Sequence, residues 1–313
     1  MRQFIQGLKV LGVGLSILLF GACAMTDTSA SSQAQWLASE HQDHPLVGRL
    51  WSVAEQRFVE PATFFAELPG NHWLLIGEQH DNPDHQRLTL AWLQALATSN
   101  RMGVLALEMA RLEQQPLLDA QLGQQVTPED LNWTQGWPWE RYGALVQQGL
   151  LQAQQVLATD PSREKQMLAY RDGAPQAALT RAQAEALDAL IDQGHCGMLP
   201  AERLPAMRQV QLFRDQVMAA TLAAVQLQGR VGLMQAGAVH TRRDIGIPRW
   251  LPDGMEYSSL WLVQVNQHQQ PEEYLAAGVD GIPITDYIYF TPAIPAVDYC
   301  EAFKSPSQSS SRR

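Results

Sequence analysis

Five short apolar runs most restrict how this chain can fold. Each spans five to seven residues, and they are His72–Gly77, Gly103–Glu108, Gln155–Thr159, Arg230–Gln235 and Ser259–Val265. Continuous apolar runs of this length are typical of strands that are buried on both faces, as in a parallel sheet. Between the first two runs, leucines at positions 88, 93 and 96 recur at helical spacing, which indicates a β–α–β unit. We therefore predict an α/β fold with a largely parallel sheet flanked by helices.

The middle of the chain differs from its two ends. Long helical stretches rich in Ala, Gln and Leu are predicted at Asp130–Gln148, Ala174–Gln193 and Leu204–Leu227. We predict an α/β domain formed by residues 41–112 and 229–303, with an inserted and mainly helical lobe at 113–228. The Ser/Gln/Arg-rich tail, 304–313, is predicted to be disordered.

The N-terminus has the pattern of an export signal. Positive charges at Arg2 and Lys9 precede an apolar run, and Gly21 and Ala22 lead directly into Cys23. The apolar run is too short to span a bilayer, and a cysteine at this place is the lipid acceptor of bacterial lipoproteins. We predict a signal peptide at 1–23, with Cys23 carrying palmitate-type acyl chains, and a flexible tether at 24–40; the alternative is an ordinary signal with a chance cysteine. Ala24 favours anchoring to the outer membrane.

Composition excludes one class of partner. Formal net charge is −10, and it becomes −12 once Arg2 and Lys9 leave with the signal. An acidic chain without a basic stripe argues against nucleic acid as a partner. Two cysteines remain beyond Cys23, and in an oxidising compartment Cys196 and Cys300 form either a disulfide or two buried thiols.

Polar residues gather where the predicted strands end. The first strand runs into Glu78 and His80, the second ends in Glu108, and the fourth leads to His240. In an open parallel sheet, ligands bind beyond the carboxyl ends of the strands. Together these four residues suit a Zn, Mn or Co ion or a general base, which predicts a metal-dependent esterase or peptidase as one candidate function. Considered alone, each of these four residues could equally have a structural role, as a helix cap or as one member of an ion pair.

Aromatic residues crowd a second segment. WTQGWPWERY at 133–142 is typical of either a packed core or a broad flat pocket. His195 follows the glycine that ends a predicted helix, and a structural role is the more common one for such a histidine.

Six ordered stretches together resemble the ChaN-like haem-binding lipoproteins. They are LLIGEQHDNPDHQ (74–86), GVLALEM (103–109), GWPWERY (136–142), HCGMLP (195–200), QAGAVHTRRDIGIP (235–248) and DYIYFTP (286–292). The resemblance runs from about residue 45 to 301 and implies a parallel α/β domain with a helical lobe.

The resemblance also implies a cofactor and a site. It implies ferric haem held non-covalently in an iron-uptake system, through a tyrosine ligand with a histidine nearby, and a haem-bridged homodimer. Tyr142 is the first candidate for the iron ligand and Tyr170 the second; phenolate is an accepted ligand of ferric haem. The other expected haem contacts are Trp139, Arg141, His80, His240, Arg242 and Arg243. Further partners would be haem-uptake receptor or transporter components. On this basis a non-catalytic haem carrier is the leading function, ahead of the hydrolase and of a purely structural envelope protein.

Overall fold

The computed structural model describes residues 36–133, 136–174 and 179–301, which belong to one compact unit that begins at Trp36. The predicted signal, Cys23 and the predicted disordered tail lie outside these residues. Residues 36–40, which were predicted as the end of the tether, belong to this unit. Ala38 is buried, and its backbone N–H donates to Asp84 Oδ2 at 2.8 Å.

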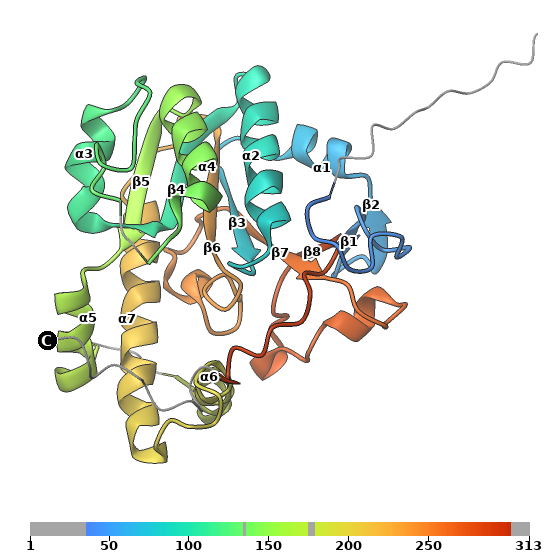
Figure 1. Ribbon diagram of the computed structural model, residues 1–313, viewed down its shortest axis with the longest axis vertical. Helices are drawn as coiled ribbons and strands as arrows, with labels where there is room; N and C mark the ends of the chain where they lie inside the picture. The colour runs from blue at the N-terminus through green and yellow to red at the C-terminus, as the bar shows by residue number, and fades with distance from the viewer. Residues whose placement is uncertain (1–35, 134–135, 175–178, 302–313) are drawn as a thin grey trace, which may run out of the picture. The chain divides into compact units, whose positions relative to one another are not determined.

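An eight-stranded sheet forms the centre of the unit, in the order β2-β1-β8-β7-β3-β6-β4-β5 (Figure 1). The strands are β1 Leu50–Ser52, β2 Arg57–Val59, β3 His72–Glu78, β4 Met102–Arg111, β5 Gln155–Asp160, β6 Val231–Gly237, β7 Tyr257–Gln264 and β8 Tyr287–Thr291. All pairings from β8 to β5 are parallel, and only β1 pairs antiparallel, with β2 and with β8. The predicted α/β class with a largely parallel sheet is confirmed.

Seven α-helices accompany the sheet in the described part of the chain. They are α1 Pro61–Glu67, α2 Pro83–Thr98, α3 Gln115–Ala120, α4 Trp139–Gln152, α5 Arg163–Asp172, α6 Arg181–Gly194 and α7 Leu204–Ala223. None of the helices in the described ranges is long and apolar enough to cross a membrane.

Alternate strand residues build two apolar layers. Leu74 and Ile76 of β3 face the core shared with α1, α2 and α4, whereas Trp73 and Leu75 face the core shared with α7. Residues on both faces of β3 are therefore apolar, which explains why the strand reads as an uninterrupted run. Beyond the carboxyl ends of β3 and β6 lie α5, α6 and the first half of α7 (Figure 1).

All three helix predictions differ from the structure at their ends. The helix predicted at 174–193 begins at Arg181, after Thr180, whose side chain caps it. The stretch predicted at 130–148 becomes helical only at Trp139, because Pro138 lacks the N–H that a helix interior needs and stands at the N-cap of α4. The helix predicted at 204–227 is shorter in the structure. It ends as α7 at Ala223, before the left-handed backbone of Gln228 (φ 52°) and Gly229 (φ 78°). β5 comes from within the range predicted as a helical lobe and forms an edge strand of the sheet. The division into two domains stays a prediction.

Candidate functional site

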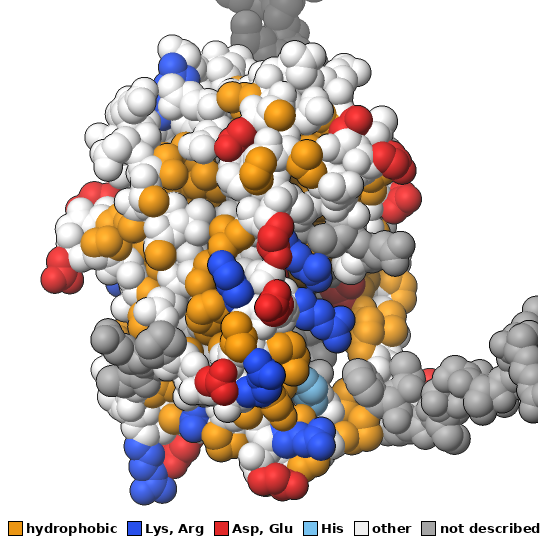
Figure 2. All heavy atoms as spheres, turned by 90° about the vertical axis from the view of Figure 1, so that its left-hand side faces the viewer, with side chains coloured by type: hydrophobic (Ala, Val, Ile, Leu, Met, Phe, Trp, Pro, Cys, Tyr) orange, Lys and Arg blue, Asp and Glu red, His pale blue; other side chains and the backbone are white. Residues whose placement is uncertain are grey.

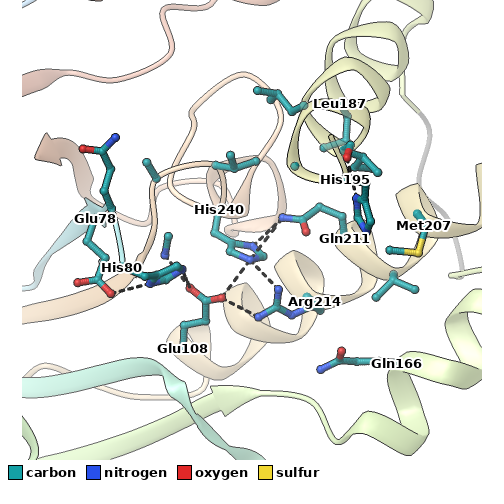
Figure 3. Close-up of a pocket in the computed structure, with 18 of the residues that line it drawn as sticks. Glu78, His80, Glu108, Gln166, Leu187, His195, Met207, Gln211, Arg214 and His240 are labelled. Atoms are coloured by element: carbon teal, nitrogen blue, oxygen red, sulfur yellow. Dashed lines mark hydrogen bonds and ion pairs between the residues drawn. The ribbon is translucent and has the colours of Figure 1, made fainter. Parts of the chain in front are cut away.

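The residues that end β3, β4 and β6 meet at one cavity, as their positions along a parallel sheet require. This cavity has a volume of about 730 Å³, which is in the range of small-molecule sites. Its charged end, which we call the cavity floor, consists of Glu78, His80, Glu108, Arg214 and His240. Figure 3 shows these side chains pointing toward one another from three strand ends and from α7.

Glu78 is the most enclosed member of the cavity floor. Its Oε1 accepts hydrogen bonds from Tyr142 Oη at 2.7 Å and from His80 Nδ1 at 2.8 Å. Its Oε2 accepts from the amides of Gln86, at 2.5 Å, and Gln235. Four donors satisfy the two buried carboxyl oxygens of Glu78, and the bond from His80 fixes the histidine ring with Nδ1 protonated.

His80 presents its other ring nitrogen to the cavity. Nε2 of His80 lies 3.8 Å from Glu108 Oε2, and about a third of the His80 side chain is exposed. The ring of Trp137 packs against it with centroids 4.7 Å apart. Burial alone would lower the pKa of His80, but the hydrogen bond to Glu78 and the charge of Glu108 outweigh it and raise the pKa above its ordinary value.

Glu108 and His240 belong to a second, largely buried network. Arg214 donates from Nη2 to Glu108 Oε1 and from Nε to Asp160 Oδ1, both at 2.7 Å. His240 lies between two carboxylates, with Nδ1 2.5 Å from Asp215 Oδ1 and Nε2 3.3 Å from Glu108 Oε1. Burial would lower the pKa of His240, but these carboxylates outweigh it and raise the pKa to about 9. Burial also opposes ionisation of Glu108, yet His240 and Arg214 hold the pKa of Glu108 well below its usual range.

The predicted metal site finds no support in this arrangement. In the ranges that the structure describes, no group of three or more His, Cys, Asp and Glu side chains is placed to hold a metal ion. The physical reason is Arg214, whose guanidinium contacts Glu108 and also lies 2.9 Å from Nε2 of His240. The guanidinium of Arg214 therefore occupies the position in which a Zn, Mn or Co ion would bind Glu108 and His240.

The opposite end of the cavity is apolar. We call it the apolar half, and it consists of Leu187, Leu190 and Ile191 of α6 with Met207 and Val210 of α7. His195 lies at this end, beside Met207 and away from Glu78 (Figure 3). Its Nδ1 is 2.7 Å from the carbonyl oxygen of Ile191, so Nδ1 carries the proton in the neutral ring. Cys196, the next residue, is joined to Cys300 by a disulfide.

Tyr142, the first candidate for a haem ligand, is a core residue. Only 1% of its surface is exposed, and its hydroxyl donates to Glu78. Burial, reinforced by the negative charge of Glu78, raises the pKa of Tyr142 far above its ordinary value, so its phenolate is strongly disfavoured. Trp139 packs in the same core, with its ring 5.3 Å from that of Trp133.

The three predicted arginine contacts are engaged elsewhere. Arg242 is buried and forms a two-point ion pair with Asp244 at 2.8 and 2.5 Å. Arg243 pairs with Asp286 at 2.8 Å, and Arg141 donates to the carbonyl oxygen of His80. Arg242 and Arg243 therefore stabilise the loop after β6, and neither lines the cavity.

From the sequence we predicted that Glu78, His80, Glu108 and His240 lie together. We did not predict their partners on α7. Arg214 and Asp215 lie in a helix otherwise rich in Ala, Gln and Leu, where charged residues are commonly solvent-exposed. One sequence feature indicates Arg214 and Asp215: they are an adjacent pair of opposite charges at the centre of a long, largely apolar helix.

Comparison with known proteins decides the family. The model of the family described as haem-binding uptake, Tiki superfamily, ChaN matches residues 64–251, which is more than half of the chain. The chain belongs to the ChaN family. None of the curated proteins compared matches it.

A solved structure of a ChaN protein agrees with the fold of this chain. ChaN of Campylobacter jejuni, described with cofacial heme binding, is 22% identical with a TM-score of 0.63, over 77% of this chain and 95% of that one. A mutant of the erythromycin esterase EreC, in its open conformation, is 11% identical with a TM-score of 0.43, over 81% of this chain and 86% of that one. The type III effector HopBA1 is 13% identical with a TM-score of 0.38, over 71% of this chain and 88% of that one. The last two likenesses are too low to bear on function.

Proposed function

We propose that this ChaN-family protein binds ferric haem non-covalently through a tyrosine, and that the ligand is Tyr170 of α5 rather than Tyr142. The observation that carries the proposal is the contrast between the two residues. Tyr142 is enclosed and bonded to Glu78, whereas Tyr170 is only half-buried, on a helix with exposed apolar side chains. A tyrosine that binds haem iron must be reachable by the haem and must lose its proton, and Tyr142 is poorly suited to both.

The surface of α5 has the chemistry that a porphyrin needs. Arg163, Gln166, Met167 and Tyr170 follow helical i, i+3, i+4, i+7 spacing and so share one side of α5, which we call the α5 face. Met167, on this face, is 48% exposed and gives apolar contact for a flat macrocycle. The exposed Arg163 is suited to pairing with a haem propionate, because a guanidinium matches a carboxylate in shape and charge.

The α5 face adjoins the cavity. Gln166 lines the cavity, and Tyr170 follows it four residues later, about 6 Å along the helix axis. His195 lines the same cavity and is the histidine that lies away from the charged floor (Figure 3). Figure 2 shows the side of the unit that carries α5, where apolar and basic side chains are interspersed. We infer that His195, rather than His80 or His240, is the histidine near the haem.

The experiment compares Tyr170→Phe with Tyr142→Phe in the full chain, each mixed with ferric haem. Wild type and Tyr142→Phe should give the high-spin ferric spectrum of a tyrosinate complex, and Tyr170→Phe should lose it while remaining folded. Loss of that spectrum in Tyr142→Phe alone would contradict the assignment to Tyr170. An identical spectrum in all three would contradict tyrosine ligation by either residue.

We further propose the cellular setting that the sequence predicts. In it, Cys23 anchors the protein by its acyl chains to the outer membrane, where it exchanges haem with receptor or transporter components. An exposed α5 face also suits a haem shared between two protomers, because a haem lying on a surface leaves one side of the macrocycle uncovered. Sedimentation with and without ferric haem tests this, and a monomer in both conditions would contradict a haem-bridged dimer.

A further inference from the structure

The chain after β8 ends in a short segment that ties two distant elements together. We call residues 295–300 the strap, and it runs from the sheet toward α6 (Figure 1). The hydroxyl of Tyr299 donates to Asp81, which lies in the loop after β3. Its neighbour Cys300 is joined by the disulfide to Cys196, at the end of α6. Two consecutive residues of the strap therefore hold the loop after β3 and the end of α6 to each other.

The two elements that the strap joins line different parts of the cavity. Asp81 directly follows His80 of the cavity floor, and Cys196 directly follows His195, which lies at the apolar half (Figure 3). Because each anchor of the strap is next in sequence to a lining residue, the strap fixes the separation of these two parts of the cavity wall.

The strap itself packs weakly against the rest of the unit. Val297 and Tyr299 are 55% and 54% exposed, and residues 295–299 are all exposed. The residue before the strap is held in a different way, because the N–H of Ile294 donates to Gln264 Oε1 on β7 at 2.8 Å. A segment that buries so little apolar surface opens readily once its cross-link is broken, and this opening should stop at Ile294.

The disulfide lies where a thiol can reach it. Neither Cys196 nor Cys300 is buried. Cys196 has a left-handed backbone with φ 60°, which is unfavourable for a residue with a side chain, and Gly197 follows it with φ 65°. Exposed or strained disulfides are reduced more readily than enclosed structural ones. These properties favour a bond that can be broken and re-formed in the folded protein.

We propose that the Cys196–Cys300 disulfide is a redox-sensitive clamp that controls access to the cavity. The oxidised bond holds the strap against the end of α6, and reduction frees the strap and the last turn of α6. The rest of α6 stays on α7, because Asp188 pairs with Arg208 at 2.9 Å and apolar side chains of both helices form one cluster. The clamp goes beyond the proposed haem function and does not depend on it.

The co-reactant is a dithiol reductant. One of its thiolates attacks the sulfur of Cys300, the S–S bond breaks, and the electron pair leaves on the sulfur of Cys196, which takes a proton. The second thiolate of the dithiol then attacks the mixed disulfide and releases Cys300, which is protonated in turn. The two cysteines are thereby reduced to thiols by two electrons, and the dithiol is oxidised to a disulfide.

The test measures how fast diethylpyrocarbonate modifies each histidine of the full chain, before and after reduction by dithiothreitol and removal of the reductant. Peptide mapping assigns each rate to one residue. The rates at His195 and His80 should rise on reduction, by roughly tenfold at His195, because loss of a cross-link makes local opening more frequent. Equal rates at both residues in the two states would overturn the proposal.

Two other histidines are internal controls in the same experiment. His268 lies outside the cavity with its side chain 40% exposed, so it should react equally in both states. His85 is 0% exposed and should stay unreactive, which shows that the reduced unit remains folded. Reaction of His85 after reduction would overturn the proposal, because the disulfide would then hold the whole fold together rather than the strap.

The matched variant carries Cys196→Ser and Cys300→Ser together. It should show the fast modification of His195 without reductant, and dithiothreitol should not change that rate. Reoxidation of the reduced wild type should restore the slow rate. A wild-type disulfide that dithiothreitol cannot reduce in the absence of denaturant would also overturn the proposal. None of these measurements uses haem, so the clamp and the haem function can fail separately.

Discussion

Glu78 shows at the scale of one residue how a buried charge is made tolerable. Four side chains donate to its two oxygens, from the loop after β3 and from α2, α4 and β6: His80, Gln86, Tyr142 and Gln235. Removing one of these donors leaves a buried carboxylate oxygen short of one hydrogen bond. This lowers the free energy of unfolding more than the loss of a hydrogen bond between neutral groups typically does.

Tyr142→Phe measures this contribution. The free energy of unfolding should fall by about 1.5–3 kcal/mol, because a hydrogen bond to a buried carboxylate is lost. Denaturant titration of wild type and variant gives the difference. An unchanged free energy of unfolding would contradict the structural role that we assign to Tyr142.

His240 makes stability depend on pH. Its raised pKa, about 9 against 6.5 in the unfolded chain, means that the folded state binds the proton more tightly. This stabilisation is complete below pH 6.5 and is lost as pH rises through about 9. The loss should be about 3 kcal/mol. Denaturant titrations across this range should show a clearly weaker pH dependence in His240→Gln, whereas an equal dependence would contradict the pairing of His240 with Glu108 and Asp215.

The residue scale is also where sequence reasoning was least complete. Glu78, His80, Glu108 and His240 could be placed together because strand ends in a parallel sheet share an edge. The accessibility of a tyrosine depends on how α4 packs against the sheet, which local sequence does not encode, so Tyr142 and Tyr170 could not be separated in advance.

At the scale of elements, the segment after β8 connects distant parts of the unit. Tyr299 donates to Asp81, which follows β3, and Cys300 is bonded to Cys196 at the end of α6. The disulfide spans 104 residues of sequence, so it restricts a large loop in the unfolded chain.

Replacing both cysteines by serine should therefore reduce stability. The expected loss is about 2–5 kcal/mol, the usual range for a native disulfide. Thermal unfolding of the double variant beside the oxidised wild type measures it. Non-reducing peptide mapping is the control, and two alkylatable thiols in the wild type would contradict the disulfide itself.

Element prediction succeeded where strands were long and buried. β3 to β7 were each found from an uninterrupted apolar run, because both faces of the central sheet are covered. β1 and β2 have three residues each, too few to establish a period, and β8 was not among the predicted strands. Their antiparallel arrangement depends on long-range pairing that only the folded chain determines.

At the scale of the whole molecule, the account predicts a lipid-anchored protein. Cys23→Ser should abolish incorporation of labelled palmitate and move the protein from the membrane fraction to the soluble fraction, because acyl chains are its only predicted anchor. Cys196→Ser serves as the matched control and should still be labelled. Continued labelling of Cys23→Ser would contradict the predicted lipid acceptor.

The central claim is that the folded chain carries one specific ferric haem at the α5 face. The most direct measurement is an absorbance titration of the full wild-type chain with ferric haem, alongside a control protein that adsorbs haem non-specifically. We expect a sharp, saturable endpoint with a tyrosinate-type spectrum in wild type, and loss of that endpoint in Tyr170→Phe. A gradual, unsaturable rise that matches the control protein would contradict it.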